Sequence, residues 1–553
     1  MVQEIFFKKN QLNSILVLKF VLKEQKLFKE KYSFVYSIAV SHILYLSGFM
    51  KILMLNPPFL NKFSRTSRSP AISKGGCVYY PIWMGYATGV LEQEGHDVKL
   101  VDATAASLTH EQAFRIAEDF SPEMIVIDSV TASFHNDVFV ANKLKDMFQE
   151  SFVMLVGDMV TAIPNEAMQA SDKIDAIARG EYDFTVRDVA RELKQKKDLS
   201  KVLGLNFRDK DNGGKIVANP QRPSITGEEL DKFPFVSDVY SRHLNIEDYF
   251  YPSVLYPEVT IITGRGCYYR CTFCKWPQTL TGHTYRSRSI KNLIDEFEWI
   301  RDNLPQVKDI MIEDDTLTQD RTRTMEMCEE IKNRGLNPTW TCNARADLDF
   351  DVMKNMKEAG CRLMCVGFES ADQQILNNIK KGTNTAKIRQ FMEDSKKAKI
   401  LIHGCFMMGN NGETQETIKK TVSFAKELDP DTAQFFPVMV YPGTEAYKWA
   451  EENGFLTTKN WNEWLKPDGT HNTIVSTDKL SAQELVDACD KARIEFYLRP
   501  KFMARKLKQI IFNPKDIPRT AISTMVFAKY LKQHIKKSYF AAPIKAQKTV
   551  ISP

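Results

Sequence analysis

The sequence GRGCYYRCTFC at residues 264–274 carries the strongest chemical signal in this 553-residue chain. It holds three of the ten cysteines, Cys267, Cys271 and Cys274, and its two glycines let the backbone wrap closely around a bound group. Thiolates are the protein ligands of iron–sulfur clusters. Three of them leave one iron of a [4Fe–4S] cluster open, as a catalytic cluster needs in order to bind a substrate. We therefore predict that these cysteines hold an iron–sulfur cluster.

Zinc is the alternative metal that cysteines at this spacing could bind. A structural zinc site takes four ligands, usually two CxxC-type pairs or added histidines. Residues 264–274 contain one CxxC, and the nearest histidine is His283. Ten cysteines in a chain of this length are too sparse for a disulfide scaffold, so we expect a reducing, cytoplasmic setting. A zinc-binding interaction protein remains the alternative interpretation.

Around this loop, β-branched runs alternate with amphipathic stretches. The predicted strands span 259–263, 308–313, 339–343, 362–368, 401–407 and 433–438, and the predicted helices span 290–303, 320–334, 350–359, 385–398 and 413–427. Strands joined in this way by helices predict a parallel α/β domain within residues 255–445, and the pattern resembles a partial, TIM-like (βα)6 barrel. Parallel barrels place their chemistry at the carboxyl ends of the strands.

Polar residues at those strand ends are the candidate site residues. Glu313 and Asp315 end the second strand, and with His403 on the fifth strand they are the candidate catalytic residues. Acids at strand ends are also common helix N-caps, and a neutral histidine is also common in a core. Asn343 and Arg345 end the third strand, where the Arg345 guanidinium is suited to binding a carboxylate through two hydrogen bonds.

The spacing CxxxCxxC, with Phe273 directly before the last cysteine, resembles the signature of the radical S-adenosylmethionine (SAM) superfamily. Gly367-Phe368-Glu369 is similar to the Gly-x-Glu element that holds the methionine amino group of SAM in that family. The resemblance implies that the open iron chelates SAM and that one electron cleaves SAM to a 5′-deoxyadenosyl radical. It also implies that the SAM site includes Phe273, Gly367, Glu369, Asn343 and Arg345, with Arg345 as the partner of the SAM carboxylate.

Residues 50–190 contain a second alternating pattern, ahead of the cysteine loop. Apolar strands are predicted at 51–55, 98–101, 124–128, 152–156 and 174–177, with helices between them. This alternation predicts an α/β domain with a doubly wound, Rossmann-like parallel sheet, which binds its ligand beyond the carboxyl ends of the strands. The residues at those ends include Asn56, Ser129, Gly157 and Arg179.

This segment resembles the cobalamin-binding domain that precedes many radical SAM barrels. The resemblance rests on Asn56-Pro57-Pro58, Trp83-Met84-Gly85-Tyr86, Gly95-His96-Asp97-Val98 and Arg179-Gly180-Glu181. It implies cobalamin as a cofactor, with Ser129 and Gly157 among its contacts. Residues 56–76 contain no histidine, so the Asp-x-His-x-x-Gly loop that ligates cobalt in many cobalamin proteins is absent. Either cobalamin binds here without a protein ligand to cobalt, or this domain has lost it.

Residues 255–300 carry a further resemblance, to hopanoid-biosynthesis-associated radical SAM proteins that form a cyclitol ether headgroup. It rests on Cys274-Lys275-Trp276-Pro277-Gln278-Thr279, Gly282-His283, Tyr285-Arg286 and Arg288-Ser289. It implies radical rearrangement or modification of a lipid-linked polyol or sugar, with the electron supplied by a reductant such as flavodoxin or ferredoxin. The alternatives are a cobalamin-dependent radical SAM C-methyltransferase and a non-catalytic iron–sulfur-binding interaction protein.

The formal net charge of +6 is unevenly distributed along the chain. Residues 500–553 hold twelve Lys and Arg against one acid, residues 1–50 are net +4, and the body between them is net −9. The helical C-terminal region, 446–553, contains basic amphipathic stretches at 481–508 and 520–539. They suit either peripheral contact with an anionic membrane or packing on the barrel. No RNA-binding module is visible, so we expect no nucleic-acid partner.

Two further segments complete the predicted organisation. Residues 1–49 differ in composition from the rest, and Met50 opens the first predicted strand, so we expect the functional chain to begin at Met50 and the extension to be a mis-called start. Residues 191–254 are predicted to form a small hairpin, with its turn near 208–215, and an ordered linker between the two domains.

Overall fold

The computed structural model describes residues 49–195 and 198–512, together with isolated helical positions beyond them. The predictions for the first 48 residues, and nearly all of the predicted helix at 520–539, lie outside these ranges. None of the helices in the described part of the chain is long and apolar enough to cross a membrane.

The N-terminal domain is built on a seven-stranded sheet in the order β2-β1-β3-β4-β5-β6-β7. Its strands are β1 (Lys51–Asn56), β2 (Asp97–Asp102), β3 (Met124–Asp128), β4 (Phe152–Val156), β5 (Ala176–Ala178), β6 (Leu205–Asp209) and β7 (Lys215–Ala218). The first five pair in parallel, and the predicted hairpin is β6–β7, which continues the sheet in antiparallel pairing from β5.

Helices cover both faces of this sheet, which confirms the doubly wound prediction. They are α4 (Ile82–Gln93), α5 (His110–Phe120), α6 (Phe134–Met147), α7 (Asp158–Ala162), α8 (Pro164–Gln169) and α9 (Asp183–Gln195). Alternate strand residues enter separate cores, because neighbouring side chains on a strand point to opposite faces. Ile52 and Met54 pack with α4 and α9, whereas Leu53 and Leu55 pack with α5 and α6.

The second domain is a partial barrel of six parallel strands in sequence order, as predicted. The strands are β8 (Glu258–Ile261), β11 (Asp309–Ile312), β12 (Trp340–Ala344), β13 (Cys361–Glu369), β14 (Leu401–Met408) and β15 (Thr432–Pro437). The connecting helices are α13 (Ile290–Asn303), α14 (Arg321–Asn333), α15 (Phe350–Glu358), α17 (Thr385–Ala398) and α18 (Gln415–Leu428), with an unpredicted short helix, α16 (Gln373–Asn378). A capping box at Thr414 starts α18.

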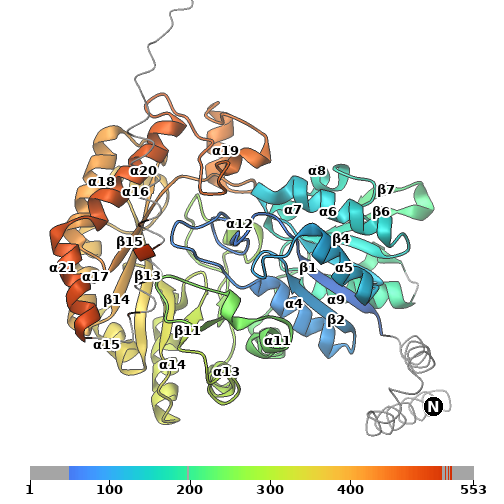
Figure 1. Cartoon of the computed structure of the whole chain (residues 1–553), viewed down its shortest axis with the longest axis horizontal. Helices are drawn as coiled ribbons and strands as arrows, with labels where there is room; N and C mark the ends of the chain where they lie inside the picture. The colour runs from blue at the N-terminus through green and yellow to red at the C-terminus, as the bar shows by residue number, and fades with distance from the viewer. Residues whose placement is uncertain are drawn as a thin grey trace, which may run out of the picture.

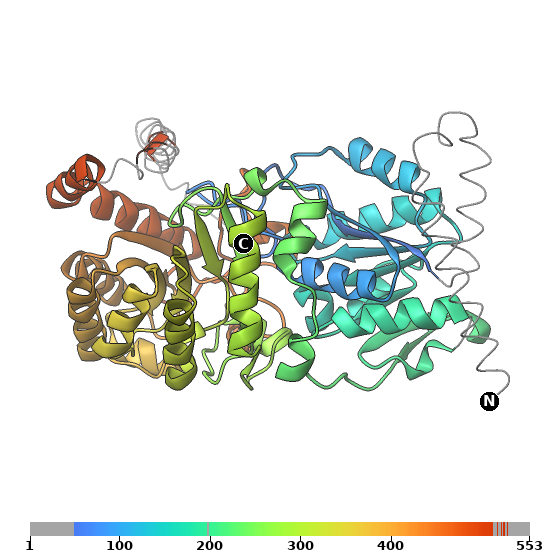
Figure 2. The same ribbon diagram turned by 90° about the horizontal axis from the view of Figure 1, so that it is seen from below.

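The two domains lie side by side with the cysteine loop between them (Figures 1 and 2). The short helix α12 (Lys275–Thr279), which follows the cysteines, packs against α7 of the N-terminal domain. In the linker, α11 (Val236–His243) packs on both α4 and β8. One apolar core, which includes Phe63 and Val130 from the first domain and Val440 and Trp464 from the second, is shared by both. The carboxyl ends of the two sheets therefore face each other.

The C-terminal helix predicted across 481–508 is two helices instead of one. Helix α20 (Ala482–Tyr497) packs along β15, and α21 (Pro500–Phe512) begins afresh at Pro500. Proline has no amide hydrogen to donate to a preceding turn, but it fits the first position of a helix well. Pro500 therefore ends one helix and starts the next.

Candidate functional site

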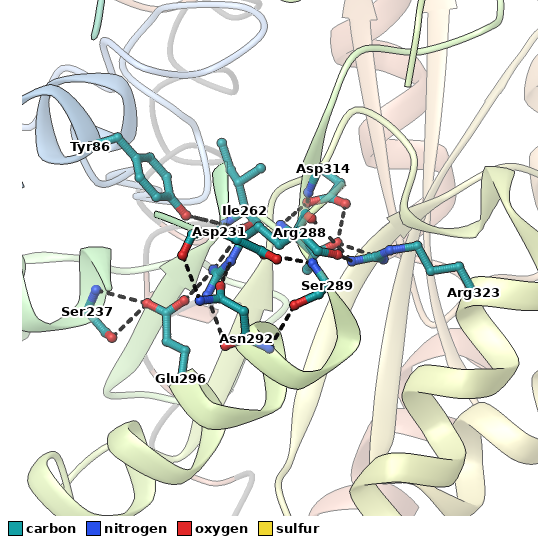
Figure 3. Close-up of polar contacts among 12 residues, drawn as sticks. Tyr86, Asp231, Ser237, Ile262, Arg288, Ser289, Asn292, Glu296, Asp314 and Arg323 are labelled. Atoms are coloured by element: carbon teal, nitrogen blue, oxygen red, sulfur yellow. Dashed lines mark hydrogen bonds and ion pairs between the residues drawn. The ribbon is translucent and has the colours of Figure 1, made fainter. Parts of the chain in front are cut away.

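The strand end that leads into the cysteine loop is fixed by side chains from other elements (Figure 3). The Tyr86 hydroxyl, on α4, donates to the Ile262 carbonyl at 3.2 Å and accepts from the Ile262 amide at 3.1 Å. Asp314 accepts from the amide and the hydroxyl of Thr263, both at 2.6 Å. Arg323, on α14, donates to the Thr263 carbonyl at 3.2 Å. The loop therefore leaves the barrel from a rigid point.

A buried ion pair supports the same strand end (Figure 3). Arg288 pairs with Glu296 of α13 and donates to the Ile262 carbonyl at 3.2 Å. Glu296 also accepts from the amide and the hydroxyl of Ser237, on α11, at 3.2 and 2.8 Å. Both charges are buried, so each depends on the other for compensation. The pair thereby joins the linker to the barrel directly beneath the cysteine loop.

One glutamine organises the cysteine loop itself. The Gln278 side-chain amide donates to three loop carbonyls, those of Cys271 at 3.3 Å, Thr272 at 3.1 Å and Cys274 at 2.8 Å. Its oxygen accepts from the Glu445 amide at 2.9 Å. Gln278 therefore holds the CxxC segment in one conformation and ties it to α19 (Glu445–Glu452). Sequence analysis had not assigned it a role.

The other half of the loop is shaped by His283 and Gly266. Nδ1 of His283 lies 3.1 Å from the carbonyl oxygens of both Cys267 and Tyr269, so this nitrogen carries the proton and donates. Gly266 has φ +91°, and a Cβ atom there would lie 2.2 Å from the Thr284 carbonyl oxygen. The nearest histidine thus serves the loop backbone, and Gly266 permits the tight wrapping that the sequence predicted.

The three cysteines are spread around the loop. Cys267 is buried, whereas Cys271 and Cys274 are half-buried. Burial raises the pKa of the Cys267 and Cys274 thiols, an effect that the Arg68 guanidinium partly opposes at Cys274. Across the described ranges, no three His, Cys, Asp or Glu side chains converge on a point suited to a single metal ion. A [4Fe–4S] cluster needs no such convergence, because each thiolate binds a different iron.

The Gly-x-Glu element at the end of β13 lies beside this loop. Glu369 has φ +62°, which is unusual for a residue with a side chain, and its carboxylate pairs with Lys381 at 2.8 Å. A Cβ atom on Gly367 would lie 2.2 Å from Glu369 Oε1, so only glycine lets this side chain fold back. Glu369 Oε2 is buried and has no hydrogen-bond partner among the described residues. It is therefore free to accept from an ammonium group. The Lys381 Nζ atom also lies 5.8 Å from the Phe273 ring centroid.

Arg345 connects the end of β12 to the cysteine loop. Its guanidinium carbon lies 3.4 Å from the Tyr269 ring centroid, and Nη1 lies 4.0 Å from Cys271 Sγ. The side chain also pairs with Asp347 at 3.1 Å and donates to the Lys381 carbonyl. Two buried cations, Arg345 and Lys381, therefore lie beside Cys271 and next to Glu369. Arg345 had been predicted as a site residue from the sequence. Lys381 had not, because it belongs to no motif that we recognised.

The candidate acids at the end of β11 meet an arginine from the other domain. Arg68 pairs with Glu313 and lies 3.6 Å from Asp315, while its guanidinium carbon sits 4.3 Å from the Trp276 ring centroid. Burial raises the pKa of Glu313, and Arg68 opposes that rise. Asn343 donates to the Asp314 carbonyl at 3.2 Å, so it supports this turn. The predicted acids thus lie together beside the cysteine loop.

His403 lies deeper in the barrel than these groups. In the strand register it is flanked by Cys365 and Thr432, one layer below Gly367, which pairs with Cys405. Its Nδ1 is 2.8 Å from the Thr432 hydroxyl. Burial lowers the pKa of His403 to about 4, so the imidazole is neutral near pH 7. His403 is therefore placed as a neutral group within the barrel, away from the loop cysteines.

The carboxyl edge of the N-terminal sheet forms a second cradle. Gly157, after β4, has φ +112°, and a Cβ atom there would lie 2.6 Å from the Ser129 carbonyl oxygen. Two buried polar atoms close to this edge, Asp158 Oδ1 and the Tyr182 hydroxyl, have no hydrogen-bond partner among the described residues. Burial raises the pKa of Asp128 to about 7. An edge lined by unsatisfied polar groups is suited to a large polar ligand, and the ligand contacts expected of Ser129 and Gly157 stay predictions.

Contacts at the domain interface join this edge to the cysteine loop. Lys275, which directly follows Cys274, pairs with Asp158, and its Nζ lies 5.0 Å from the Tyr441 ring centroid. Trp276 meets Trp83 of α4 edge to face, with ring centroids 5.2 Å apart. Neither contact was predicted, because each depends on a pairing between domains. The two cradles consequently meet at the interface between the domains.

The residues present fit the predicted groups. The cysteine loop supplies three thiols on a glycine-permitted turn, Glu369 offers an unpaired carboxylate oxygen for the SAM amino group, and Gly157 opens the other edge. The 56–76 loop supplies Arg65 and Arg68 where many cobalamin proteins supply a histidine. Arg65 is bound to Asp137 at 3.0 Å, and Arg68 to Glu313, so both arginines are held in place.

Comparison with known proteins identifies both halves of the chain. Residues 261–425 match the radical SAM superfamily, and residues 69–190 match the B12-binding domain. An uncharacterized methyltransferase of Pyrococcus horikoshii is 30% identical over 83% of this chain and 95% of its own length. The cytidylyl-2-hydroxyethylphosphonate methyltransferase of Streptomyces wedmorensis is 26% identical over 74% of this chain and 83% of its own.

A solved structure has the same arrangement of domains. It is TsrM from Kitasatospora setae, a radical SAM methyltransferase with cobalamin and a [4Fe–4S] cluster bound. The TM-score is 0.60 at 16% identity, covering 82% of this chain and 90% of TsrM. At this level of identity the likeness concerns the fold.

Proposed function

Because this chain belongs to the radical SAM superfamily, in the group that carries a B12-binding domain, we propose that it is a cobalamin-dependent methyltransferase that uses SAM as the methyl donor. It is an enzyme whose cofactors are a [4Fe–4S] cluster, SAM and cobalamin. When bound, these groups supply one-electron cleavage of SAM and a carrier for its methyl group. The substrate is a small molecule, and the electron comes from a reductant, for which we propose flavodoxin or ferredoxin.

The observation that carries this proposal is the contact between the two cofactor cradles. Lys275 extends the cysteine loop directly onto Asp158, at the carboxyl edge where cobalamin would bind. A carrier of methyl groups needs access both to its donor and to the acceptor. An enzyme that used only a 5′-deoxyadenosyl radical would not require the cysteine loop to contact the carboxyl edge of the N-terminal sheet.

The chain's own residues have separable roles in this reaction. Cys267, Cys271 and Cys274 hold the cluster, while Glu369 accepts from the SAM ammonium. Arg345 neutralises the SAM carboxylate through its guanidinium. These assignments, like the roles of Phe273, Gly367 and Asn343 beside them, rest on the motif and on the positions described above.

We assign proton transfer to three residues of the barrel, Glu313, Asp315 and His403. Glu313 and Asp315 both face the Arg68 guanidinium, which compensates their charge. His403 is neutral near pH 7 and can accept a proton within the barrel. We propose these three as the catalytic candidates for deprotonating or orienting the acceptor.

Radical rearrangement of a lipid-linked polyol is the second candidate. It rests on the resemblance of residues 255–300 alone, whereas both curated relatives described above are named as methyltransferases. We therefore favour methyl transfer, the alternative that sequence analysis had left open, and retain the lipid-linked substrate as a testable proposal.

Product analysis separates the two reactions. The enzyme is reconstituted anaerobically with iron, sulfide and hydroxocobalamin, then given methyl-deuterated SAM and dithionite. Methyl transfer predicts S-adenosylhomocysteine that depends on added cobalamin, with the deuterated methyl group lost from SAM. 5′-Deoxyadenosine as the sole SAM product of the cobalamin-loaded enzyme would instead support rearrangement. Cys271→Ala is the control for background cleavage.

A further inference from the structure

Helix α21 presents two different faces. On one face, Phe502 is buried against the rings of Phe496 and Tyr497, with centroids 5.6 and 5.0 Å away. Arg505 donates to the carbonyls of Asp429 and Pro430 at 2.9 and 2.7 Å, just before β15 begins. These contacts attach the helix to the amino-terminal side of the barrel, away from the strand ends that carry the site.

The opposite face of α21 is apolar and exposed. Met503, Leu507 and Ile511 are 56%, 62% and 65% exposed, and Phe512 at the helix end is 72% exposed. At 100° per residue, positions 503, 507 and 511 fall within an arc of about 80°. Single exposed apolar side chains are ordinary, but a continuous stripe of them usually marks an interaction surface. We call Met503, Leu507 and Ile511 the α21 stripe, because Phe512 lies about 100° further round the helix than Ile511.

Lysines border the α21 stripe on both sides. Lys501 and Lys508 lie along one edge of the stripe and Lys506 along the other, as the helical spacing places them. The helix itself contains no acidic residue, and residues 500–553 hold twelve Lys and Arg against one acid. An apolar sector between rows of lysine, on a chain whose body is net negative, is complementary to a surface that is both apolar and anionic.

We propose that α21 docks on the surface of a bilayer containing anionic lipids, with the α21 stripe among the acyl chains and the lysines at the headgroups. Helices with this division of residues lie in the plane of the interface. Basic residues add electrostatic attraction to anionic headgroups. The proposal is independent of the reaction proposed above.

The position of α21 is compatible with such docking. The helix lies at the end of the molecule opposite the N-terminal domain (Figures 1 and 2). The domain interface, where both cradles lie, is therefore not covered when α21 contacts a flat surface. A nucleic acid would satisfy the lysines but would leave the apolar stripe in water, so a bilayer accounts for more of the observations.

Vesicle flotation tests the proposal on the full-length enzyme. We expect flotation with phosphatidylcholine vesicles that contain phosphatidylglycerol, and at least ~10-fold weaker binding to phosphatidylcholine alone. Met503→Gln/Leu507→Gln/Ile511→Gln should reduce binding to the anionic vesicles by at least ~10-fold. Lys501→Glu/Lys508→Glu should also reduce binding to the anionic vesicles, and this reduction should be larger at low salt than at high salt, because salt screens the attraction. All changed side chains are exposed, and Asp429, which pairs with Lys501 at 3.3 Å, keeps Arg499 and Arg505 as partners, so folding and SAM cleavage in the absence of vesicles should be unchanged.

Lys354→Glu/Lys357→Glu on α15 is the matched control, because it changes charge equally at two other exposed lysines. It should float like the wild type. The proposal is overturned if the wild type does not float, or if the triple glutamine variant binds as well as the wild type. It is also overturned if light scattering shows a wild-type dimer that this variant converts to monomer without any vesicle binding, since the stripe would then contact a second copy.

Discussion

Lys275, the residue next to the last loop cysteine, forms a buried ion pair with Asp158 at the carboxyl edge of the other domain. Both side chains are nearly inaccessible, at 2% and 7% exposure. A buried pair in this position gives little net stability but strongly penalises any arrangement that separates its partners. It therefore fixes the position of one cofactor cradle relative to the other, as the proposed methyl transfer between them requires.

Removing one partner of this pair should destabilise the protein. Lys275→Met leaves the Asp158 carboxylate buried without its cation, at a cost of about 3–5 kcal/mol. Adding Asp158→Asn to this variant should restore part of the loss, because no uncompensated charge remains. Urea midpoints measured anaerobically test both expectations. Lys448→Met breaks the exposed pair with Glu452 and should cost under ~0.5 kcal/mol. Equal midpoints for the two lysine variants would contradict the role given to Lys275.

Gln278 should control how firmly the cluster is held. Gln278→Leu removes the two N–H donors that the three loop carbonyls share, and because a typical hydrogen bond is worth about 1 kcal/mol, the cysteine loop loses its fixed conformation. After reconstitution, we expect a chelator to remove iron from this variant at least ~5-fold faster than from the wild type. A loss of about 1 kcal/mol, the worth of one hydrogen bond, corresponds to this factor. Iron and sulfide per chain, followed over time, provide the measurement. Gln483→Leu, on the exposed face of α20, should retain iron like the wild type.

The sequence predicted the parts of this site better than their arrangement. Periodicity located the six barrel strands and five connecting helices, because each pattern is local, and the cysteine spacing identified the loop. Lys381 and Gln278 were missed because a lysine or glutamine acquires its role only from a tertiary partner. Arg68 was missed for the same reason, since its acidic partners lie 245 residues further along the chain. The single amphipathic stretch predicted at 481–508 is two helices, because Pro500 ends one and starts the next.

Glu369 should determine the affinity for SAM. Glu369→Gln removes the charge of the acceptor for the SAM ammonium, and hydrogen bonds to charged groups are worth about 1.5–3 kcal/mol. We therefore expect SAM to bind roughly 10- to 100-fold more weakly, measured by calorimetry on the reconstituted enzyme, with iron content unchanged. Lys381→Met should behave differently. It removes a competing cation, so SAM should raise the melting temperature of this variant more than that of the wild type. The assignment fails if Glu369→Gln binds SAM normally.

His403 should make the stability depend on acidic pH. Its pKa is lowered to about 4 by burial, so between pH 6.5 and 4 the unfolded chain binds a proton that the folded chain does not. Stability is therefore full above pH 6.5 and is lost as the pH falls, by about 2 kcal/mol between pH 7.5 and 5. His403→Gln should remove this contribution from urea midpoints at the two pH values. His471, whose pKa is also lowered to about 4, should still contribute to the pH dependence of stability in this variant. An unchanged pH slope in His403→Gln would refute the assignment.

Gly157 should be required for cobalamin binding because of its surroundings as well as its φ of +112°. In Gly157→Ala the new methyl group would lie 2.6 Å from the Ser129 carbonyl and 2.9 Å from Asp128 Oδ1, so the edge between β3 and β4 must shift. Gly213→Ala provides the matched control, because Gly213 has φ +66° but no atom within 4 Å of the added carbon. The control should cost about 1 kcal/mol of stability and retain cobalamin. Gly157→Ala should retain at least ~10-fold less after gel filtration, measured by corrinoid absorbance, for a loss of about 1.4 kcal/mol in binding. If both variants retain cobalamin equally, the ligand does not depend on this edge.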